Sequence, residues 1–255
     1  MTSKQRTDLI EHHIRGHKYA DLRSLAEHFG GSLSTVRRAL DSLERRGIVR
    51  RHHGGASLIE TDAVSQEYDF VSRVQRHPDQ KFAIASLIAE QVQPGTTVIL
   101  DGGTTTYAVA RLLVEKRVQV ITNSLPVASL FGEVGNVETI VTGGSILGRL
   151  GTLVGPLCEA SFEQVHADLA ILGGTGITEN GVWNHNALVI AAQRKMIAAA
   201  ERTVFALDAS KFGRKALSLT APFGPRMTVV TDTRPSPLVV SAIVAAGAKL
   251  TLAGK

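Results

Sequence analysis

The sequence predicts two domains, a mostly helical winged helix-turn-helix at the N-terminus and a C-terminal α/β domain with a largely parallel sheet. A capped, arginine-rich helical segment runs directly into a short basic hairpin over residues 32–56. From residue 78 onward, short β-branched segments alternate with helical patterns, which is typical of a parallel α/β sheet. A chain of 255 residues is also long enough to bury two hydrophobic cores.

Two amphipathic helices are expected before the arginine-rich segment. Residues 6–14 place Leu9, Ile10 and Ile14 at helical spacing. Residues 22–29 repeat the pattern, and Asp21 stands where a capping side chain is preferred. Gly30 and Gly31 then predict a tight turn.

The third helix is expected to enter a DNA groove. Ser32 precedes Val36, Leu40 and Leu43, whose spacings of four and three form one apolar stripe below a polar, arginine-rich face. Residues 48–55 follow as a strand-like pair, a basic tip and a glycine turn, which predicts a wing beside the helix. The alternative is a helical bundle whose arginines are merely solvated. The residues expected to contact DNA are Ser32, Ser34, Thr35, Arg37, Arg38, Arg50, Arg51, His52 and His53.

The excess positive charge lies almost entirely in the N-terminal part of the chain. Residues 1–60 hold 11 Lys and Arg against 7 Asp and Glu, a net of +4, whereas residues 61–255 hold 17 against 16, a net of +1. Six of the nine histidines also lie within residues 1–60. This asymmetry favours contacts to DNA phosphates in the N-terminal domain.

Composition also bears on the compartment. The single cysteine, Cys158, excludes a disulfide framework within one chain and suits a reducing environment. Residues 1–15 are polar, and no stretch approaches the roughly 20 apolar residues of a membrane span. A cytoplasmic protein without membrane association is therefore expected.

A linker is expected over residues 58–77, between a DNA-binding domain at 1–57 and an effector-sensing domain at 78–255. Pro78 begins an amphipathic helix that Pro94 and Gly95 end. The strands predicted after it are Thr97–Leu100, Val118–Thr122, Val137–Thr142, Leu169–Leu172, Thr203–Leu207, Met227–Thr231 and Lys249–Leu252.

Small and polar residues collect where most of these strands end, and that edge of an open α/β sheet is where ligands bind. The loop 101–106, Asp-Gly-Gly-Thr-Thr-Thr, would bring glycine backbone and the free amides of a helix N-terminus to an anion such as a phosphate. It lacks the Lys–Ser/Thr ending of a Walker loop, and an ordinary strand–helix turn is the alternative. Lys211 and the threonines are expected to hold the anion, with Asp101 and Asn123 taking hydroxyls. The expected effector-binding residues are Asp101, Gly103, Thr104, Thr105, Thr106, Asn123, Gly144 and Lys211.

Both halves resemble the DeoR family of bacterial sugar-metabolism regulators. In the first half the matching residues are Thr35–Arg38, Leu40, Leu43–Glu44, Gly47 and His53–Ala56. In the second they are Asp101–Thr106, Thr122–Ser124, Gly143–Gly144, Gly155–Pro156 and Asp208–Gly213. The resemblance implies a sensor domain similar to ribose-5-phosphate isomerase that detects phosphorylated sugars or related metabolites. Three places depart from the family: Gly31 stands for a usual valine, Ala39 for a usual acidic residue, and residues 187–193 lack the usual acidic residues and lysine. Residues 183–186, just upstream, are also unusual.

The function expected is that of a DNA-binding transcriptional regulator, a repressor of a carbohydrate-catabolism operon released by a phosphorylated sugar or related metabolite. Its expected partners are double-stranded operator DNA, that small anion, and further copies of the chain in a homodimer or homotetramer. No cofactor, metal site or catalytic residue is expected. The alternatives are an activator, or a sugar-phosphate isomerase-like enzyme in which Asp101, Asp208 and Lys211 act as acid and base.

Overall fold

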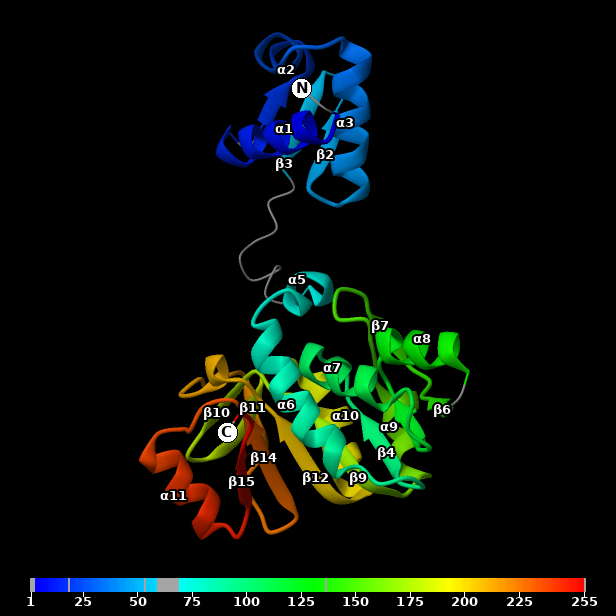
Figure 1. The fold of residues 1–255 in the computed structure, drawn as a ribbon, viewed down its shortest axis with the longest axis vertical. Coiled ribbons are helices and arrows are strands. Elements are labelled where there is room, and N and C mark those ends of the chain that lie inside the picture. Colours follow the sequence, from blue (N-terminus) through cyan, green and yellow to red (C-terminus); the bar gives the residue numbers. More distant parts are fainter. Residues whose placement is uncertain (1–2, 18, 53, 59–68, 136, 255) are drawn as a thin grey trace. The chain divides into compact units, whose positions relative to one another are not determined.

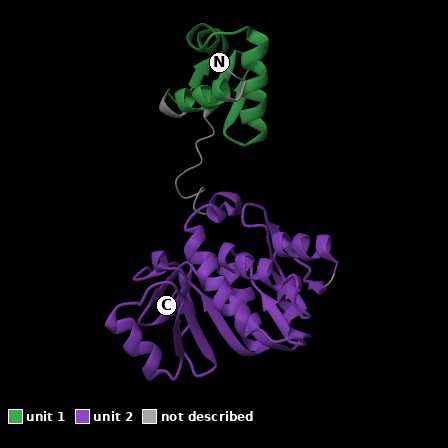
Figure 2. Ribbon diagram, in the orientation of Figure 1, with its two compact units in different colours: residues 1–66 green, residues 67–255 purple. Residues whose placement is uncertain are grey.

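The computed structural model describes residues 3–17, 19–52, 54–58, 69–135 and 137–254 (Figure 1). It divides into two compact units, residues 1–66 and residues 67–255, coloured green and purple in Figure 2. His53, expected at the wing tip, and residues 59–68 of the expected linker lie outside the described residues.

The N-terminal unit is a winged helix-turn-helix, as predicted. Its elements are α1 (Ser3–His17), β1 (Tyr19–Asp21), α2 (Leu22–Phe29), α3 (Leu33–Arg45), β2 (Val49–His52) and β3 (Gly55–Leu58). The wing strands β2 and β3 pair antiparallel, and β1, which was not expected, pairs with the other edge of β3. The core is the predicted apolar stripe, with Ile10, Ile14, Leu25, Val36, Leu40, Leu43 and Val49 at most 1 % exposed.

Two side chains start the DNA-binding helices where the sequence predicts them to start. The Asp21 carboxylate accepts hydrogen bonds from the amides of Arg23 at 2.8 Å and Ser24 at 3.1 Å. Ser32 Oγ accepts from the amide of Thr35 at 3.3 Å. All three bonds occupy amides that a helix start would otherwise leave unpaired.

The C-terminal unit is built on a seven-stranded, wholly parallel sheet. All seven predicted strands are present, and their ends lie within three residues of those expected. They are β4 (Thr97–Leu100), β5 (Gln119–Thr122), β6 (Glu138–Val141), β9 (Ala167–Leu172), β12 (Ala200–Ala206), β14 (Met227–Thr231) and β15 (Lys249–Leu252), in the spatial order β15-β14-β12-β9-β4-β5-β6.

Each face of this sheet is covered, which explains its continuous apolar strands. In β4, Val98 and Leu100 belong to one buried cluster and Ile99 to the other, because successive side chains point to opposite faces. Helices α6 (Pro78–Gln91), α7 (Thr104–Leu113) and α8 (Leu125–Val134) contribute to the first cluster, and α9 (Pro156–Glu163), α10 (Ala187–Ala198) and α11 (Pro237–Ala245) to the second. No helix in the described part of the chain is long and apolar enough to cross a membrane.

Two small antiparallel sheets were not predicted. One is the hairpin of β7 (Ser145–Leu147) and β8 (Thr152–Val154), and the other comprises β10 (Gly176–Thr178), β11 (Gly181–Asn184) and β13 (Ser218–Ala221). Strands of three or four residues are too short to show a distinct hydrophobic period.

The C-terminal unit begins earlier than the expected boundary at Pro78. Helix α5 (Phe70–Val74) starts at Asp69, whose carboxylate accepts from the amide of Ser72 at 2.8 Å. The amide of Phe70 donates to the carbonyl of Arg149 at 3.0 Å, and its ring lies edge-on to Tyr107, 5.4 Å between centroids. The segment 69–77, expected to belong to a linker, is therefore part of this unit, because tertiary contacts hold a helix too short to be read from its pattern.

Candidate functional site

The N-terminal unit presents the polar face of α3. Ser34, Arg37 and Arg38 are exposed and Thr35 is half-buried, opposite the buried stripe. Arg38 Nε donates to the carbonyl of Ser34 at 3.5 Å, which lays this guanidinium along the first turns of the helix. The start of a recognition helix is where side chains reach base edges and phosphates.

The wing residues divide into two groups. Arg50 and His52 are exposed, and His52 Nε2 lies 2.8 Å from Ser57 Oγ. Arg51 instead forms an ion pair with the Asp41 carboxylate of α3, while its amide donates to Glu44 Oε1 at 2.9 Å. Arg51, expected to contact DNA, thus also fastens the wing to the helix.

The expected role of Ser32 changes in the same way. Its hydroxyl caps α3 and lies 2.7 Å from Ser34 Oγ and 3.0 Å from Thr35 Oγ1, so its bonds serve the helix start.

A surface hollow lies between α3 and the wing. The residues that line it are Arg37, Arg51, His52, Leu22, Leu40 and Gly55.

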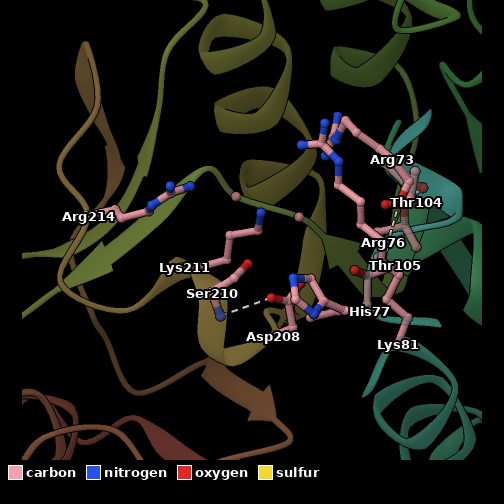
Figure 3. Close-up of a pocket in the computed structure, with 15 residues that line it drawn as sticks. Arg73, Arg76, His77, Lys81, Thr104, Thr105, Asp208, Ser210, Lys211 and Arg214 are labelled. Carbon is pink, nitrogen blue, oxygen red and sulfur yellow. Dashed lines mark hydrogen bonds between the residues drawn. The ribbon is translucent and has the colours of Figure 1, made fainter. Parts of the chain in front are cut away.

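The C-terminal unit contains a polar pocket of about 190 Å³ at the carboxyl ends of central strands (Figure 3). Five cationic side chains line it against one carboxylate, that of Asp208, which gives a net charge of +4 for these groups. Lys211 and Arg214 lie on one side of the pocket and the other cations on the opposite side. The cations among its described lining residues are Arg73, Arg76, Lys81, Lys211 and Arg214. Such an excess of positive charge favours an anion.

The start of α7 forms part of the wall. Thr104 and Thr105 line the pocket, and Gly103 at the N-cap has no side chain to satisfy the first-turn amides. Those amides and the helix dipole favour a negative charge at this point. Thr106 also lines the pocket, and its hydroxyl oxygen lies 2.8 Å from each of the carbonyl oxygens of Asp101 and Gly103, to either of which it can donate, so it stabilises the loop as well.

A buried lysine organises the turn that supplies the two arginines. Lys81 is 6 % exposed, and its Nζ donates to the carbonyls of Arg73 and Arg76. Burial lowers the pKa of Lys81 to about 8, although Asp208 acts in the opposite direction. His77, between this turn and α6, has a φ of 51°, the one positive φ at a non-glycine residue among those described. Left-handed backbone at such a residue is strained, and strain of this kind is concentrated at functional sites.

Asp208 is held in its charged form beside the cations. Burial by itself would raise the pKa of its carboxyl, but hydrogen bonds from Ser210 and the charge of Lys211 hold the pKa below its usual range. The Ser210 amide donates to the carboxylate at 3.0 Å, the bond drawn in Figure 3. Asp208 therefore carries its negative charge close to Lys211.

Asp101 lines a smaller adjoining pocket, and its carboxylate already accepts hydrogen bonds from three protein groups. Its carboxylate is 1 % exposed and accepts from Gln193 Nε2 at 2.6 Å and from the amides of Gly102 at 2.7 Å and Gly173 at 3.2 Å. Burial raises the pKa of Asp101 to about 6, and these bonds offset only part of that effect. The carboxylate that was expected to take ligand hydroxyls is therefore largely occupied by protein donors.

Two expected ligand-binding residues do not reach either pocket. Asn123 is fully buried, and its Nδ2 donates to the carbonyl of Leu153 at 2.9 Å, which ties β5 to the β7–β8 hairpin. Gly144 has a φ of 127°, and a Cβ there would lie 2.6 Å from the carbonyl oxygen of Val154. Both residues serve packing of the hairpin.

The sequence reasoning missed the residues that precede and follow Pro78. Arg73, Arg76, His77 and Lys81 all line the larger pocket, as does Arg214 beyond the 208–213 motif. The basic residues of 73–77 are the signal in the sequence, but they lie within the segment expected to be a linker. No group of three His, Cys, Asp or Glu side chains that could hold a metal occurs in the described ranges.

Comparison with known families assigns both units. Residues 6–62 match the DeoR-like helix-turn-helix domain, and residues 76–233 match the DeoR C-terminal sensor domain. Together these matches cover most of the chain.

Characterised relatives match over nearly their whole length. The glycerol-3-phosphate regulon repressor of Escherichia coli strain K12 is 31 % identical over 92 % of this chain and 93 % of its own. The L-fucose operon activator of Haemophilus influenzae is 30 % identical over 89 % and 91 %, and the transcriptional repressor AccR of Agrobacterium fabrum is 32 % identical over 86 % and 85 %.

Solved structures align with parts of this chain at low identity. Ribose-5-phosphate isomerase A from Methanocaldococcus jannaschii aligns with a TM-score of 0.39 and 17 % identity over 53 % of this chain and 54 % of that one. The translation initiation factor eIF-2B of Pyrococcus horikoshii aligns with a TM-score of 0.38 and 18 % identity over 83 % and 69 %. These similarities concern the fold alone.

Proposed function

Because the chain belongs to the DeoR family of transcriptional regulators, we propose that it represses a carbohydrate-catabolism operon and is released from DNA by a phosphorylated sugar or related metabolite. The N-terminal unit would bind the operator through α3 and the wing. The C-terminal unit would hold the effector at its carboxyl-end pocket.

The observation that carries the effector assignment is the charge of that pocket. Five cations face one carboxylate, and the uncapped start of α7 adds unpaired amides. A phosphate monoester carries up to two negative charges at neutral pH and three acceptor oxygens, so it can use several of these donors together. A neutral sugar would form none of these charge-assisted hydrogen bonds.

The family contains both repressors and activators, since one relative is named a repressor and another an activator. We favour repression because several of the matching relatives are named repressors. Repression predicts that deleting the gene raises expression of the target operon without effector, whereas activation predicts that expression falls.

A regulator rather than an enzyme is the function that the site supports. Asp101, a candidate acid or base, already accepts hydrogen bonds from Gln193 and two backbone amides.

A regulator of bacterial operons acts where operator DNA lies, so the proposed compartment is the cytoplasm.

A symmetric homo-oligomer is part of the proposal. One winged helix covers only a short site, and two-fold symmetric dimers bind repeated or palindromic half-sites. The chain has a mass of 27.2 kDa, so light scattering of the protein bound to its operator should give at least twice that mass after the mass of the DNA is subtracted. A single 27.2 kDa species on DNA would refute the oligomer.

The test of the proposed function has two stages. Purified protein is first used to select DNA fragments from the regions flanking its own gene, and a mobility-shift titration then measures the operator Kd. Phosphorylated sugars, their unphosphorylated counterparts and inorganic phosphate are added next. The proposal requires that a phosphorylated compound, and not its unphosphorylated counterpart, weakens operator binding. Turnover of that compound by the protein alone would contradict a purely regulatory role.

A further inference from the structure

The smaller pocket beside Asp101 is continuous with the anion pocket. Five residues line both of them: Arg73, Gly103, Gly173, Gly174 and Lys211. The smaller pocket has a volume of about 50 Å³. A single water needs roughly 10–15 Å³ on this measure, so the smaller pocket holds roughly three or four non-hydrogen atoms. A ligand anchored by its phosphate in the larger pocket can thus extend one or two carbons into the smaller one.

The inner wall of the smaller pocket is a chain of neutral hydrogen-bonding groups. Thr175 Oγ1 donates to Asn184 Oδ1 at 3.2 Å, and Asn184 Nδ2 donates to Gln193 Oε1 at 3.3 Å. Gln193 Nε2 then donates to Asp101 Oδ2 at 2.6 Å. Each donor in this series therefore points toward the Asp101 carboxylate. The side chain that stabilises the carboxylate is a neutral amide, and not the cation that a buried carboxylate would be expected to pair with.

The outer end of this chain is accessible to a ligand. Thr175 and His185 are half-buried at the pocket, and His185 Nδ1 lies 2.8 Å from Thr175 Oγ1. Because the single hydroxyl hydrogen of Thr175 goes to Asn184, the imidazole Nδ1 is the donor in this pair. A hydroxyl suits such a wall, since it can both donate and accept.

A second negative charge is poorly suited to the same place. It would approach the buried Asp101 carboxylate, whose contacts are one amide side chain and two backbone amides. Like charges repel strongly where burial excludes water. Arg73 and Lys211 stand at the boundary that both pockets share, where the phosphate would already engage them.

We propose that the smaller pocket is a specificity subsite for the uncharged, hydroxyl-bearing end of the effector, contacted by Thr175 and His185, and that it discriminates against ligands with a second acidic group at that end. The effector class is thus a sugar or polyol monophosphate ending in a hydroxylated carbon, as opposed to a bisphosphate or a phosphorylated sugar acid. This inference rests on the proposed anion pocket.

The experiment compares matched pairs that differ only at the end away from the phosphate. Sorbitol 6-phosphate is paired with 6-phosphogluconate, and glycerol 3-phosphate with 3-phosphoglycerate. Titration calorimetry on the full-length protein at pH 7.5 gives the Kd of each compound and of inorganic phosphate. In the pair that binds more tightly, the neutral-ended member should bind at least tenfold more tightly than its acidic partner. Equal affinities, or preference for the acidic member, would overturn the subsite.

Variants test which side chains discriminate between the neutral-ended and the acidic ligands. Thr175→Val and His185→Ala should weaken the neutral-ended ligand at least fivefold relative to inorganic phosphate measured on the same variant. Gln193→Lys places a cation against Asp101 and should reduce the discrimination between the paired ligands. Asn180→Ala, exposed in the β10–β11 turn, is the matched control. An unchanged ratio in both Thr175→Val and His185→Ala would refute the assignment even if Gln193→Lys did not fold.

The failures of the two proposals are distinguishable. If neither inorganic phosphate nor any phosphorylated compound binds, the anion pocket and the proposed function fail together. If the phosphorylated compounds bind but the paired members do not differ, the anion pocket stands and the subsite alone is refuted.

Discussion

Replacing Lys211 by alanine should weaken effector binding strongly while leaving operator binding intact. Lys211 lines both pockets and lies beside Asp208. A hydrogen bond to a charged group contributes about 1.5–3 kcal/mol, and each 1.4 kcal/mol is tenfold, so the effector Kd should rise roughly 10- to 150-fold. The upper end is expected because Asp208 would then face the phosphate without its counter-charge.

The assay is calorimetric titration of the effector into wild type and Lys211→Ala, followed by operator binding with and without effector. In a repressor the variant should stay on DNA at effector concentrations that release wild type, which silences target genes even when inducer is present. Lys215→Ala is the matched control, because Lys215 is exposed four residues away and does not line either pocket. Wild-type effector affinity in Lys211→Ala would refute the assignment of the anion pocket.

Three further substitutions test other parts of the account. Arg37→Ala or Arg38→Ala should reduce operator affinity by about 1–3 kcal/mol with unchanged effector binding, and an unaltered operator Kd and salt dependence in the double variant would show that α3 does not read DNA. Burial raises the pKa of Asp101 to about 6, so this group stabilises the fold below about pH 4 and that contribution is lost as pH rises through about 6. The denaturant midpoint of Asp101→Asn relative to that of wild type should therefore rise from pH 3.5 to 7, and parallel profiles would argue against a buried, proton-binding Asp101. Gly144→Ala should lower the stability of the C-terminal unit by at least about 1 kcal/mol, because the backbone of Gly144 has a positive φ and a Cβ there would lie too close to the Val154 carbonyl oxygen. A stable Gly144→Ala variant with weakened effector binding would instead indicate that Gly144 contacts the ligand.

Much of the fold could be predicted from local patterns. The stripe Val36, Leu40 and Leu43 and the cap at Ser32 mark α3, because a helix must bury one face and satisfy its first amides. The parallel strands were visible for a similar reason, since strands buried on both faces are continuously apolar. Only a weak helical pattern, around Tyr68, Val71 and Val74, marks α5 in the sequence, because a helix of five residues held by contacts with Arg149 and Tyr107 spans little more than one turn.

The site could be predicted only in part because strand order is not written in the local sequence. Asp101, Gly173 and Asp208 follow β4, β9 and β12, which are neighbours in the sheet, and they lie at the two pockets. Asn123 follows β5, toward the edge strand β6, and is occupied by the β7–β8 hairpin. The cations of residues 73–81 come from a segment brought to the same place by tertiary contacts, which no spacing rule along the chain reveals.

The central claim is that an anion bound in the C-terminal unit changes the DNA affinity of the N-terminal unit, which requires the effector to favour one of two states of the protein. The most direct measurement is the operator Kd at fixed salt, with and without a saturating phosphorylated ligand whose binding a thermal shift has established. The account predicts that the ligand raises the operator Kd by about 5- to 150-fold in wild type, the usual range of such coupling, and leaves it unchanged in Lys211→Ala. An operator Kd that stays constant in wild type while the ligand is demonstrably bound would contradict it.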